Sequence, residues 1–448
     1  MRTKRTAQLS LFDPEPVDHP IADSLEAISA WLDAHPELLG AIADDLGAAA
    51  SSRGREGLSC ETVLRCAVLK HLRQETWRGL EFTLRDSVSA RRFARVEPMR
   101  LPKKSALQAT IGAVRADTWE GVNRYLLRAA HGAGIETGER VRVDSTVTET
   151  HISAPADSRL LYDGVRVLTR LLVVARERLG AEGLAFHDHR RAAKRRHLEM
   201  RTQRGRPRRA RTYRQLLRLA RRTLGYLEVA LPVVAATHAP WARRWCHDAI
   251  HYSDLLRRVM DQSVRRVLQG ETVPAADKIV SLFEPHTDIV RKGGRDTFYG
   301  HKVNLATGRS GLVLDAVVET GNPPDSTRCL AMLERHRAHY GAAPSHAAFD
   351  GGYASRDNLI QAKALGVQHV VFHRKAGLKI ADMTPSSWLY DQLKRFRAGI
   401  EAGISYLKRC FGLTRCPWRG LARFKAYVHS AIFTHNLVRL ARLRPQPI

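Results

Sequence analysis

The sequence lacks long apolar runs, paired cysteines and enough acidic residues to balance its basic ones. No run of 18 or more apolar residues occurs in the 448 residues, so no transmembrane helix is expected. No apolar segment follows the basic first residues, which argues against a secretory signal. The six cysteines form no C-x-x-C pair, so neither a zinc ribbon nor a disulfide framework is indicated. Reduced thiols in a cytoplasmic protein are expected.

The shortage of acidic residues is the most informative feature of the composition. Lys and Arg number 73 against 45 Asp and Glu, which gives a net charge of +28. A surplus of this size usually serves to bind a polyanion, and nucleic acid is the first candidate. A structural role of the ribosomal type is an alternative. A membrane-surface role is disfavoured because the most basic segment lacks an amphipathic Trp/Phe/Leu face.

The positive charge is unevenly distributed. Residues 1–50 hold three basic and nine acidic residues, whereas residues 190–222 hold 15 basic residues and one acid, Glu199. The second segment therefore predicts contact with a nucleic-acid backbone. Gly205 and Pro207 at its centre predict a loop or a flexible arm before the chain returns to helix. The arginines singled out as DNA contacts are Arg195, Arg196, Arg206, Arg208 and Arg209.

The order of the expected elements predicts an α/β fold. A strand ends at Asp144, a hairpin covers residues 298–319, and two further strands cover residues 346–349 and 367–373. Helices are expected between and after these later strands, and residues 155–280 have a helical pattern. Without residues ~151–285 the order is β-β-β-α-β-α-β-α, which is that of a ribonuclease-H-like mixed sheet. The first and fourth strands of that sheet are adjacent, so Asp144 and Asp350 should be neighbours.

The expected domains follow from this order. They are an acidic helical N-terminal segment at 1–50, a helical DNA-binding or dimerisation domain at 51–135, a ribonuclease-H-like catalytic domain at 136–154 and 285–440, and a basic helical insert at 155–284. In the second of these, Ser59 is expected to cap the first helix. Whether these helices form a helix-turn-helix DNA reader or only pack as a bundle stays open.

Three acidic residues make a candidate metal site. Phosphoryl transfer on DNA uses two divalent cations about 4 Å apart, held by carboxylate oxygens. Asp144 and Asp350 supply two carboxylates, and Glu401 supplies a third from a basic helix. Arg397, Glu401 and Lys408 are spaced R-x3-E-x6-K, which places them on one helical face.

Other acidic residues are weaker candidates for this site. Glu319 ends a strand, and Asp325 is expected to cap a helix. Asp296 and Asp315 lie at or in the hairpin, and none of the four has both a strand end and a cationic helix around it. Glu149, five residues after Asp144, is expected to lie in a loop.

Four sequence segments resemble the DDE transposases of bacterial insertion sequences. They are RVDSTVTETHI, YGHKVNLAT…GLVLDAVVETGNPPDS, AAFDGGYAS, and R-x3-E-x6-K followed by GLTRCPWRG. The ordered set is similar to the ISNCY-type and related groups, over residues ~57–440. The resemblance implies that Asp144, Asp350 and Glu401 bind two Mg²⁺ ions, with Mn²⁺ as an alternative, and that Arg397 and Lys408 contact transposon-end DNA. The sequence departs from related transposases at Lys394, where many have tyrosine.

The resemblance also implies a function. An insertion-sequence transposase binds terminal inverted repeats, cleaves the element's end to give a 3′-OH, and joins that end to target DNA. Its partner is double-stranded DNA, on which it would act as a homodimer or higher oligomer, in the cytoplasm at the bacterial nucleoid. Two alternatives are a ribonuclease-H-like nuclease without strand transfer and a catalytically inactive DNA-binding protein derived from a transposase.

Overall fold

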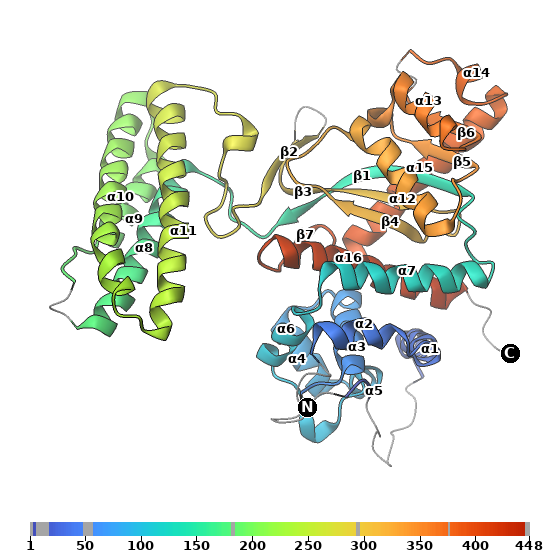
Figure 1. Cartoon of the computed structure of the whole chain (residues 1–448), viewed down its shortest axis with the longest axis horizontal. Helices are drawn as coiled ribbons and strands as arrows, with labels where there is room; N and C mark the ends of the chain where they lie inside the picture. Colours follow the sequence, from blue (N-terminus) through green and yellow to red (C-terminus); the bar gives the residue numbers. More distant parts are fainter. Residues whose placement is uncertain are drawn as a thin grey trace. The chain divides into compact units, whose positions relative to one another are not determined.

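The computed structural model describes residues 3–5, 18–47, 57–180, 184–292, 296–374 and 377–443. The chain divides into two compact units, shown in Figure 1. The first combines Met1–Glu149 with His301–Ile448, and the second is Thr150–Gly300. The described helices include none with the length and apolarity that crossing a membrane requires.

A seven-stranded mixed sheet organises the α/β fold. Its strands are β1 (Arg140–Thr150), β2 (Asp288–Lys292), β3 (Asp296–Thr307), β4 (Val313–Val318), β5 (His346–Phe349), β6 (His369–Phe372) and β7 (Arg415–Cys416). The strand order is β2-β3-β1-β5-β6, with β4 also paired to β3 and β7 to β1. It places the first and fourth predicted strands, β1 and β5, side by side. β3 and β4 form the expected antiparallel hairpin, whereas β1 and β5 are parallel. The strands β1, β3, β4, β5 and β6 follow the predicted order, whereas β2 and β7 were not predicted.

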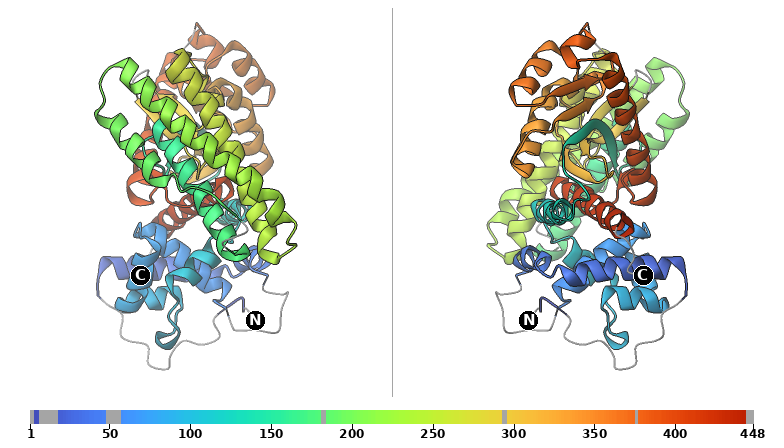
Figure 2. Two further views of the ribbon diagram at one scale, coloured as in Figure 1. Left: turned by 90° about the vertical axis from the view of Figure 1, so that its left-hand side faces the viewer. Right: turned by 90° about the vertical axis from the view of Figure 1, so that its right-hand side faces the viewer.

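Helices cover the sheet and form a separate N-terminal layer in the first unit. They are α1 (Pro20–Ala34), α2 (Leu38–Asp45), α3 (Cys60–Leu72), α4 (Trp77–Asp86), α5 (Val88–Ala94), α6 (Lys104–Ile111), α7 (Ala116–Gly132), α12 (Cys329–Tyr340), α13 (Arg356–Ala364), α14 (Ile380–Met383), α15 (Ser387–Cys410) and α16 (Leu421–Leu443). The helices α7 and α16 lie side by side between the sheet and helices α1 to α6 (Figures 1 and 2). The Ser59 side chain caps α3 by accepting from the Thr62 N–H at 3.0 Å, as expected. One apolar core therefore joins the N-terminal helices to the sheet.

In the second unit, four α-helices of the described residues share a core of their own. They are α8 (Asp157–Leu179), α9 (Arg190–Thr202), α10 (Arg206–Ala235) and α11 (Pro240–Ser263). The structure corrects the prediction of a loop or flexible arm around Gly205 and Pro207, because only residues 203–205 separate α9 from α10. Pro207 lies in the first turn of α10, where a missing N–H removes no helical hydrogen bond. Proline at this position starts the helix and does not interrupt it.

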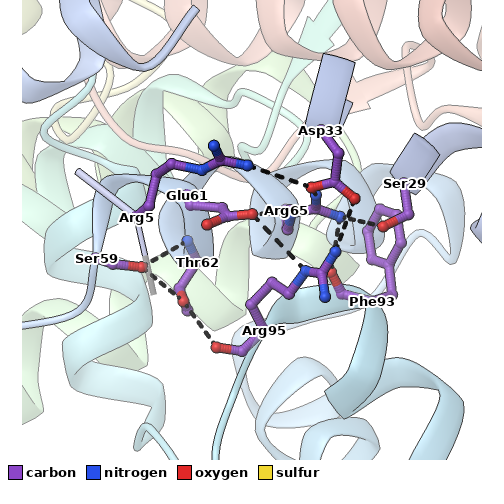
Figure 3. Close-up of polar contacts among 9 residues, drawn as sticks. All are labelled: Arg5, Ser29, Asp33, Ser59, Glu61, Thr62, Arg65, Phe93 and Arg95. Atoms are coloured by element: carbon purple, nitrogen blue, oxygen red, sulfur yellow. Dashed lines mark hydrogen bonds and ion pairs between the residues drawn. The ribbon is translucent and has the colours of Figure 1, made fainter. Parts of the chain in front are cut away.

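A buried arginine links three of the N-terminal helices. The side chain of Arg65 is only 1% exposed, and its guanidinium contacts Asp33 at 2.7 Å and Glu61 at 3.1 Å. It also donates to Ser29 Oγ and to the carbonyl of Phe93 (Figure 3). Burial lowers the pKa of Arg65, and the two carboxylates oppose that change. Arg65 therefore holds α1, α3 and α5 together and is not placed to read DNA.

Replacing this arginine should destabilise the fold. We expect Arg65→Ala to lower the free energy of unfolding by about 3 kcal/mol, because it removes the buried guanidinium that compensates the charges of Asp33 and Glu61. The control is Arg73→Ala, which removes an arginine that is 45% exposed and pairs with Glu75, and which should cost under about 1 kcal/mol. Urea unfolding followed by circular dichroism measures both. Equal losses for the two variants would contradict the assignment.

Buried histidines should make the first unit sensitive to mild acid. Burial lowers the pKa of His71 to about 3, and of His336 and His435 to about 4 each. Their folded-state pKa values lie below the unfolded value near 6.5, so their contribution to stability is complete above pH 6.5 and is lost as the pH falls toward 4. Each histidine that takes up a proton on unfolding adds a slope of about 1.4 kcal/mol per pH unit. Urea unfolding at pH 7.5 and pH 5 measures this, and a stability at pH 5 equal to that at pH 7.5 would contradict it.

Candidate active site

Three carboxylates from three different elements meet around one arginine. Asp144 lies on β1, Asp350 follows directly after β5, and Glu401 lies on α15. In the β1–β5 ladder Val143 is opposite Phe349, so the next residues on the two strands are Asp144 and Asp350. All three carboxylates contact the guanidinium of Arg397, also on α15. The structure thus brings together the three acidic residues that the sequence singled out.

The contacts of Arg397 define the geometry of this triad. Its Nη2 lies 2.6 Å from Asp144 Oδ2 and 3.0 Å from Asp350 Oδ1. Its Nη1 lies 2.9 Å from Glu401 Oε1. The Arg397 side chain is 7% exposed, whereas Asp350 is 38% and Glu401 67% exposed. The triad is therefore buried at Asp144 and opens to solvent at Glu401.

The structure places Asp144 within a strand and not at its end. Pairing with β5 stops at Val143, but β1 continues to Thr150 because it pairs next with β7. The N–H of Glu149 accordingly donates to the carbonyl of Thr414 at 2.9 Å. Glu149 therefore lies on the strand, and the expectation of a loop there is wrong. The β7 strand is two residues long, which is too short to show a period-2 pattern in the sequence.

A second arginine fixes α15 against β1. Arg142, two residues before Asp144, donates to the carbonyl of Phe396 at 2.8 Å and to Thr307 Oγ1 at 2.9 Å. Its guanidinium also lies over the Phe396 ring, 4.8 Å from the centroid. A Cβ at Gly399 would collide with this guanidinium in its present position, so glycine leaves room for it there. Arg142 therefore sets the distance between the strand that carries Asp144 and the helix that carries Glu401.

Polar residues beside the triad were not identified from the sequence. Lys302 Nζ contacts Asp325 Oδ1 at 2.9 Å, and Ser145 Oγ donates to Asp325 Oδ2 at 3.3 Å. The sequence predicted that Asp325 caps a helix, and this prediction is wrong. Asp325 instead binds these two side chains. The N-cap residue of α12 is instead Arg328.

A buried tyrosine extends this network. The hydroxyl of Tyr353 donates to Asn304 Oδ1 at 2.6 Å, and Asn304 Nδ2 donates to Glu319 Oε1 at 2.7 Å. Burial, followed by the charges of Asp325 and Asp144, raises the pKa of Tyr353 well above its ordinary value. Lys302 and Asn304 alternate on β3, and this period-2 polar pair on a buried strand is the signal that could have revealed the network.

Three of the other candidate carboxylates pair with arginines other than Arg397. Asp315 pairs with Arg335 at 2.6 Å, and Glu319 pairs with Arg328 at 2.5 Å. Glu149 pairs with Arg415 at 2.7 Å. An ion pair with an arginine therefore accounts for the presence of each of these three acidic residues.

The triad fits a divalent cation by its chemistry. Within the described ranges, no group of three or more His, Cys, Asp or Glu side chains already has the arrangement of a metal centre. The three carboxylates nevertheless converge on a single cationic group, the guanidinium of Arg397. Carboxylate oxygens are the ligands that Mg²⁺ and Mn²⁺ prefer. A cation that binds all three acids is therefore compatible with this donor set.

The residues expected to bind DNA are placed differently from one another. Arg397 is buried among the carboxylates, whereas Lys408 is half-buried two turns beyond Glu401 on α15. Arg195 and Arg196 lie on α9, and both contact Glu199. Arg206, Arg208 and Arg209 are exposed in the first turn of α10. Cations are electrostatically disfavoured at a helix N-terminus, so these three arginines do not stabilise α10.

Two family models match the chain. A transposase DDE domain matches residues 277–437, and a transposase domain of uncharacterised function matches residues 11–110. The first match includes Asp350 and Glu401, and it begins after Asp144 and most of the second unit. No curated protein and no solved structure was found to match the chain.

Proposed function

We propose that this chain, which belongs to the DDE transposases of insertion sequences, binds the terminal inverted repeats of its element and catalyses metal-dependent cleavage and strand transfer. The observation that carries the proposal is the convergence of Asp144, Asp350 and Glu401 on one cationic group. The ribonuclease-H-like strand order that places β1 beside β5 supports it. Two Mg²⁺ or Mn²⁺ ions are the proposed cofactors.

The three carboxylates act as metal ligands in this proposal. Bound divalent cations would supply Lewis-acid activation of the attacking oxygen and stabilise the charge on the phosphate. In the first step, water attacks the phosphorus at the element's end, which leaves a 3′-OH on the element and a 5′-phosphate on the flanking strand. In the second step, that 3′-OH attacks a phosphodiester of the target, which forms a new phosphodiester and releases a target 3′-OH. The protein's part is to hold the three carboxylates in place.

Residues around the triad have positioning roles. Arg142 keeps α15 at a fixed distance from β1. Lys302 and the half-buried Asp325 form an ion pair beside Ser145, which holds the segment that follows Asp144. The protonated Tyr353 anchors the turn after Asp350 to Asn304 on β3. These contacts keep the acidic residues near one another before any cation binds.

The second unit is proposed to bind the DNA backbone. The proposed contacts include Arg195, Arg196, Arg206, Arg208 and Arg209. Arg208 is also the first of five arginines that follow one face of α10, here named the arginine stripe: Arg208, Arg211, Arg214, Arg218 and Arg222. All five are exposed, and none has an ion-pair partner among the described residues. The stripe extends over about 21 Å, and a DNA duplex of that length carries about twelve phosphate charges. Its length and charge fit a duplex backbone.

An oligonucleotide assay tests the proposed function. Duplexes that end in the inverted repeats flanking the gene are incubated with the full chain and Mg²⁺, and both cleavage and joining to a target plasmid are scored. We expect cleavage at the repeat end and strand-transfer products from pre-cleaved ends. Cleavage without transfer would favour a nuclease, and metal-independent binding without cleavage would favour an inactive DNA-binding protein.

A further inference from the structure

The environment of Arg397 differs from that of a DNA-contacting residue. The guanidinium is buried, and its two terminal nitrogens contact Asp144, Asp350 and Glu401. Its Nε is also buried and has no hydrogen-bond partner among the described residues. Arg397 is therefore held in place by the triad and by no other described polar partner.

Arg397 occupies the position at which a metal ligand set needs a cation. A guanidinium remains charged at any physiological pH, so it cannot yield to a metal by losing a proton. Three carboxylates and one guanidinium have a net formal charge of −2, and two added divalent cations would change it to +2. Close approach of like charges in a partly buried site is costly. The guanidinium and the divalent cations thus oppose each other's binding.

We propose that Arg397 is a built-in competitor for the metal site, so that divalent cations bind the free protein only by displacing its guanidinium from the three carboxylates. The proposal rests on the proposed function, because it takes the triad to be the metal site. DNA phosphates bring the negative charge that balances the loaded site and attract the displaced guanidinium. Metal loading is thereby linked to the arrival of DNA.

The structure provides a route for this displacement. Glu401 is one turn beyond Arg397 on the exposed surface of α15, and its side chain is 67% exposed. The arginine side chain can rotate toward that surface without movement of the helix backbone. The released guanidinium would then lie beside the solvent-exposed part of the triad. This would allow the DNA contact that the family resemblance implies for Arg397.

Mn²⁺ binding to the DNA-free, full-length protein tests the proposal. Mn²⁺ affinity is measured by the loss of the free-ion electron paramagnetic resonance signal for the wild type, Arg397→Gln and Arg395→Gln. Arg395 is a matched control on the same helix, since it is exposed and bonds only to the Asp391 carbonyl among the described residues. We expect Arg397→Gln to bind Mn²⁺ at least 10-fold more tightly than the wild type, and Arg395→Gln to stay within about 2-fold.

A double variant separates failure of this inference from failure of the proposed function. If Asp144→Asn abolishes Mn²⁺ binding in the Arg397→Gln background, the triad is the metal site. If Asp144→Asn weakens wild-type binding but Arg397→Gln is no tighter than the wild type, the competition is refuted and the proposed function stands. If Asp144→Asn has no effect in either background, both are refuted.

A conservative variant keeps the test valid if Arg397→Gln does not fold. Lysine retains the charge but lacks the planar guanidinium of arginine. In the wild type, Nη2 of this group contacts Asp144 and Asp350, and Nη1 contacts Glu401. Arg397→Lys should therefore bind Mn²⁺ with an affinity above that of the wild type, and Arg395→Lys should match the wild type. An unchanged or weaker Mn²⁺ affinity in Arg397→Lys would overturn the proposal.

Discussion

Asp144→Asn, Asp350→Asn and Glu401→Gln are each expected to lower DNA cleavage and strand transfer roughly 1000-fold or more. Each substitution keeps the size of the side chain and removes a charged ligand, and loss of several kcal/mol of transition-state stabilisation corresponds to a factor of that size. Binding to duplex DNA should stay within about 3-fold, because these residues lie apart from the arginine stripe in sequence and in unit. The Mg²⁺-dependent oligonucleotide assay measures the first effect and fluorescence anisotropy the second.

A carboxylate outside the triad provides the control for this prediction. Asp391 is exposed on α15, six residues before Arg397, and Asp391→Asn removes the same charge from the same helix. We expect its activity to stay within about 2-fold of the wild type. Wild-type cleavage by any one of the three triad variants would remove that residue from the assignment.

Asp315 and Asp325, the other candidate carboxylates, provide two further variants for the same assay. Asp315 pairs with Arg335, so Asp315→Asn should act on stability and not on the chemical step. Asp325 is a different case, because it contacts Lys302 and Ser145 beside Asp144. Its removal should lower activity less than removal of Asp144, since it positions a neighbour and holds no proposed ligand role.

The proximity of the triad could be predicted because strand order determines it. Once β1 and β5 are assigned as the first and fourth strands, their parallel pairing places Asp144 beside Asp350. The third acid could be predicted from helical periodicity, since Arg397 and Glu401 are four residues apart. These predictions needed the periodicities of strands and helices together with the strand order of a ribonuclease-H-like sheet, and the structure confirms the proximity.

The burial of Arg397 and Arg65 could not be predicted in the same way. Both arginines look like surface charges in the sequence, and their burial depends on acidic partners from other elements. The network of Lys302 and Asp325 was missed for the same reason, because 23 residues separate two side chains that the hairpin brings together. The extension of β1 depends on β7, a two-residue partner more than 250 positions away. Long-range pairing of this kind leaves no local periodicity to read.

The expected loop around Gly205 shows a different error. Glycine, proline and dense positive charge are typical of a flexible arm, but Pro207 lies in the first turn of a 30-residue helix. The buried face of α10 carries Leu216, Leu217, Ala220 and Leu224, which pack into the core of the second unit. Because packing fixes this face, the helix backbone that carries the arginine stripe on the opposite face is ordered. Cations on an ordered backbone lose less conformational entropy on binding than cations on a flexible arm would.

Replacing the five arginines of the stripe by glutamine should therefore weaken binding to duplex DNA about 1000-fold near 0.15 M salt. Each phosphate contact releases bound counterions, so five lost contacts should reduce the slope of log Kd against log salt by about 4.5. The five side chains have no ion-pair partners among the described residues, so the variant should remain folded. Fluorescence anisotropy with a 30-base-pair duplex at several salt concentrations measures both quantities.

The matched control removes the same charge from other surfaces of the second unit. It replaces five exposed arginines of α8 and α11: Arg170, Arg178, Arg243, Arg244 and Arg258. If DNA binding depended only on net charge, the two five-fold variants would lose affinity and salt slope equally. If the stripe binds the backbone, the slope of log Kd against log salt should fall several-fold more in the stripe variant than in the control variant. The reason is that only a continuous row of cations can follow a phosphate backbone. Equal slopes would show that the +28 charge acts as a diffuse field, and that α10 has no special place in it.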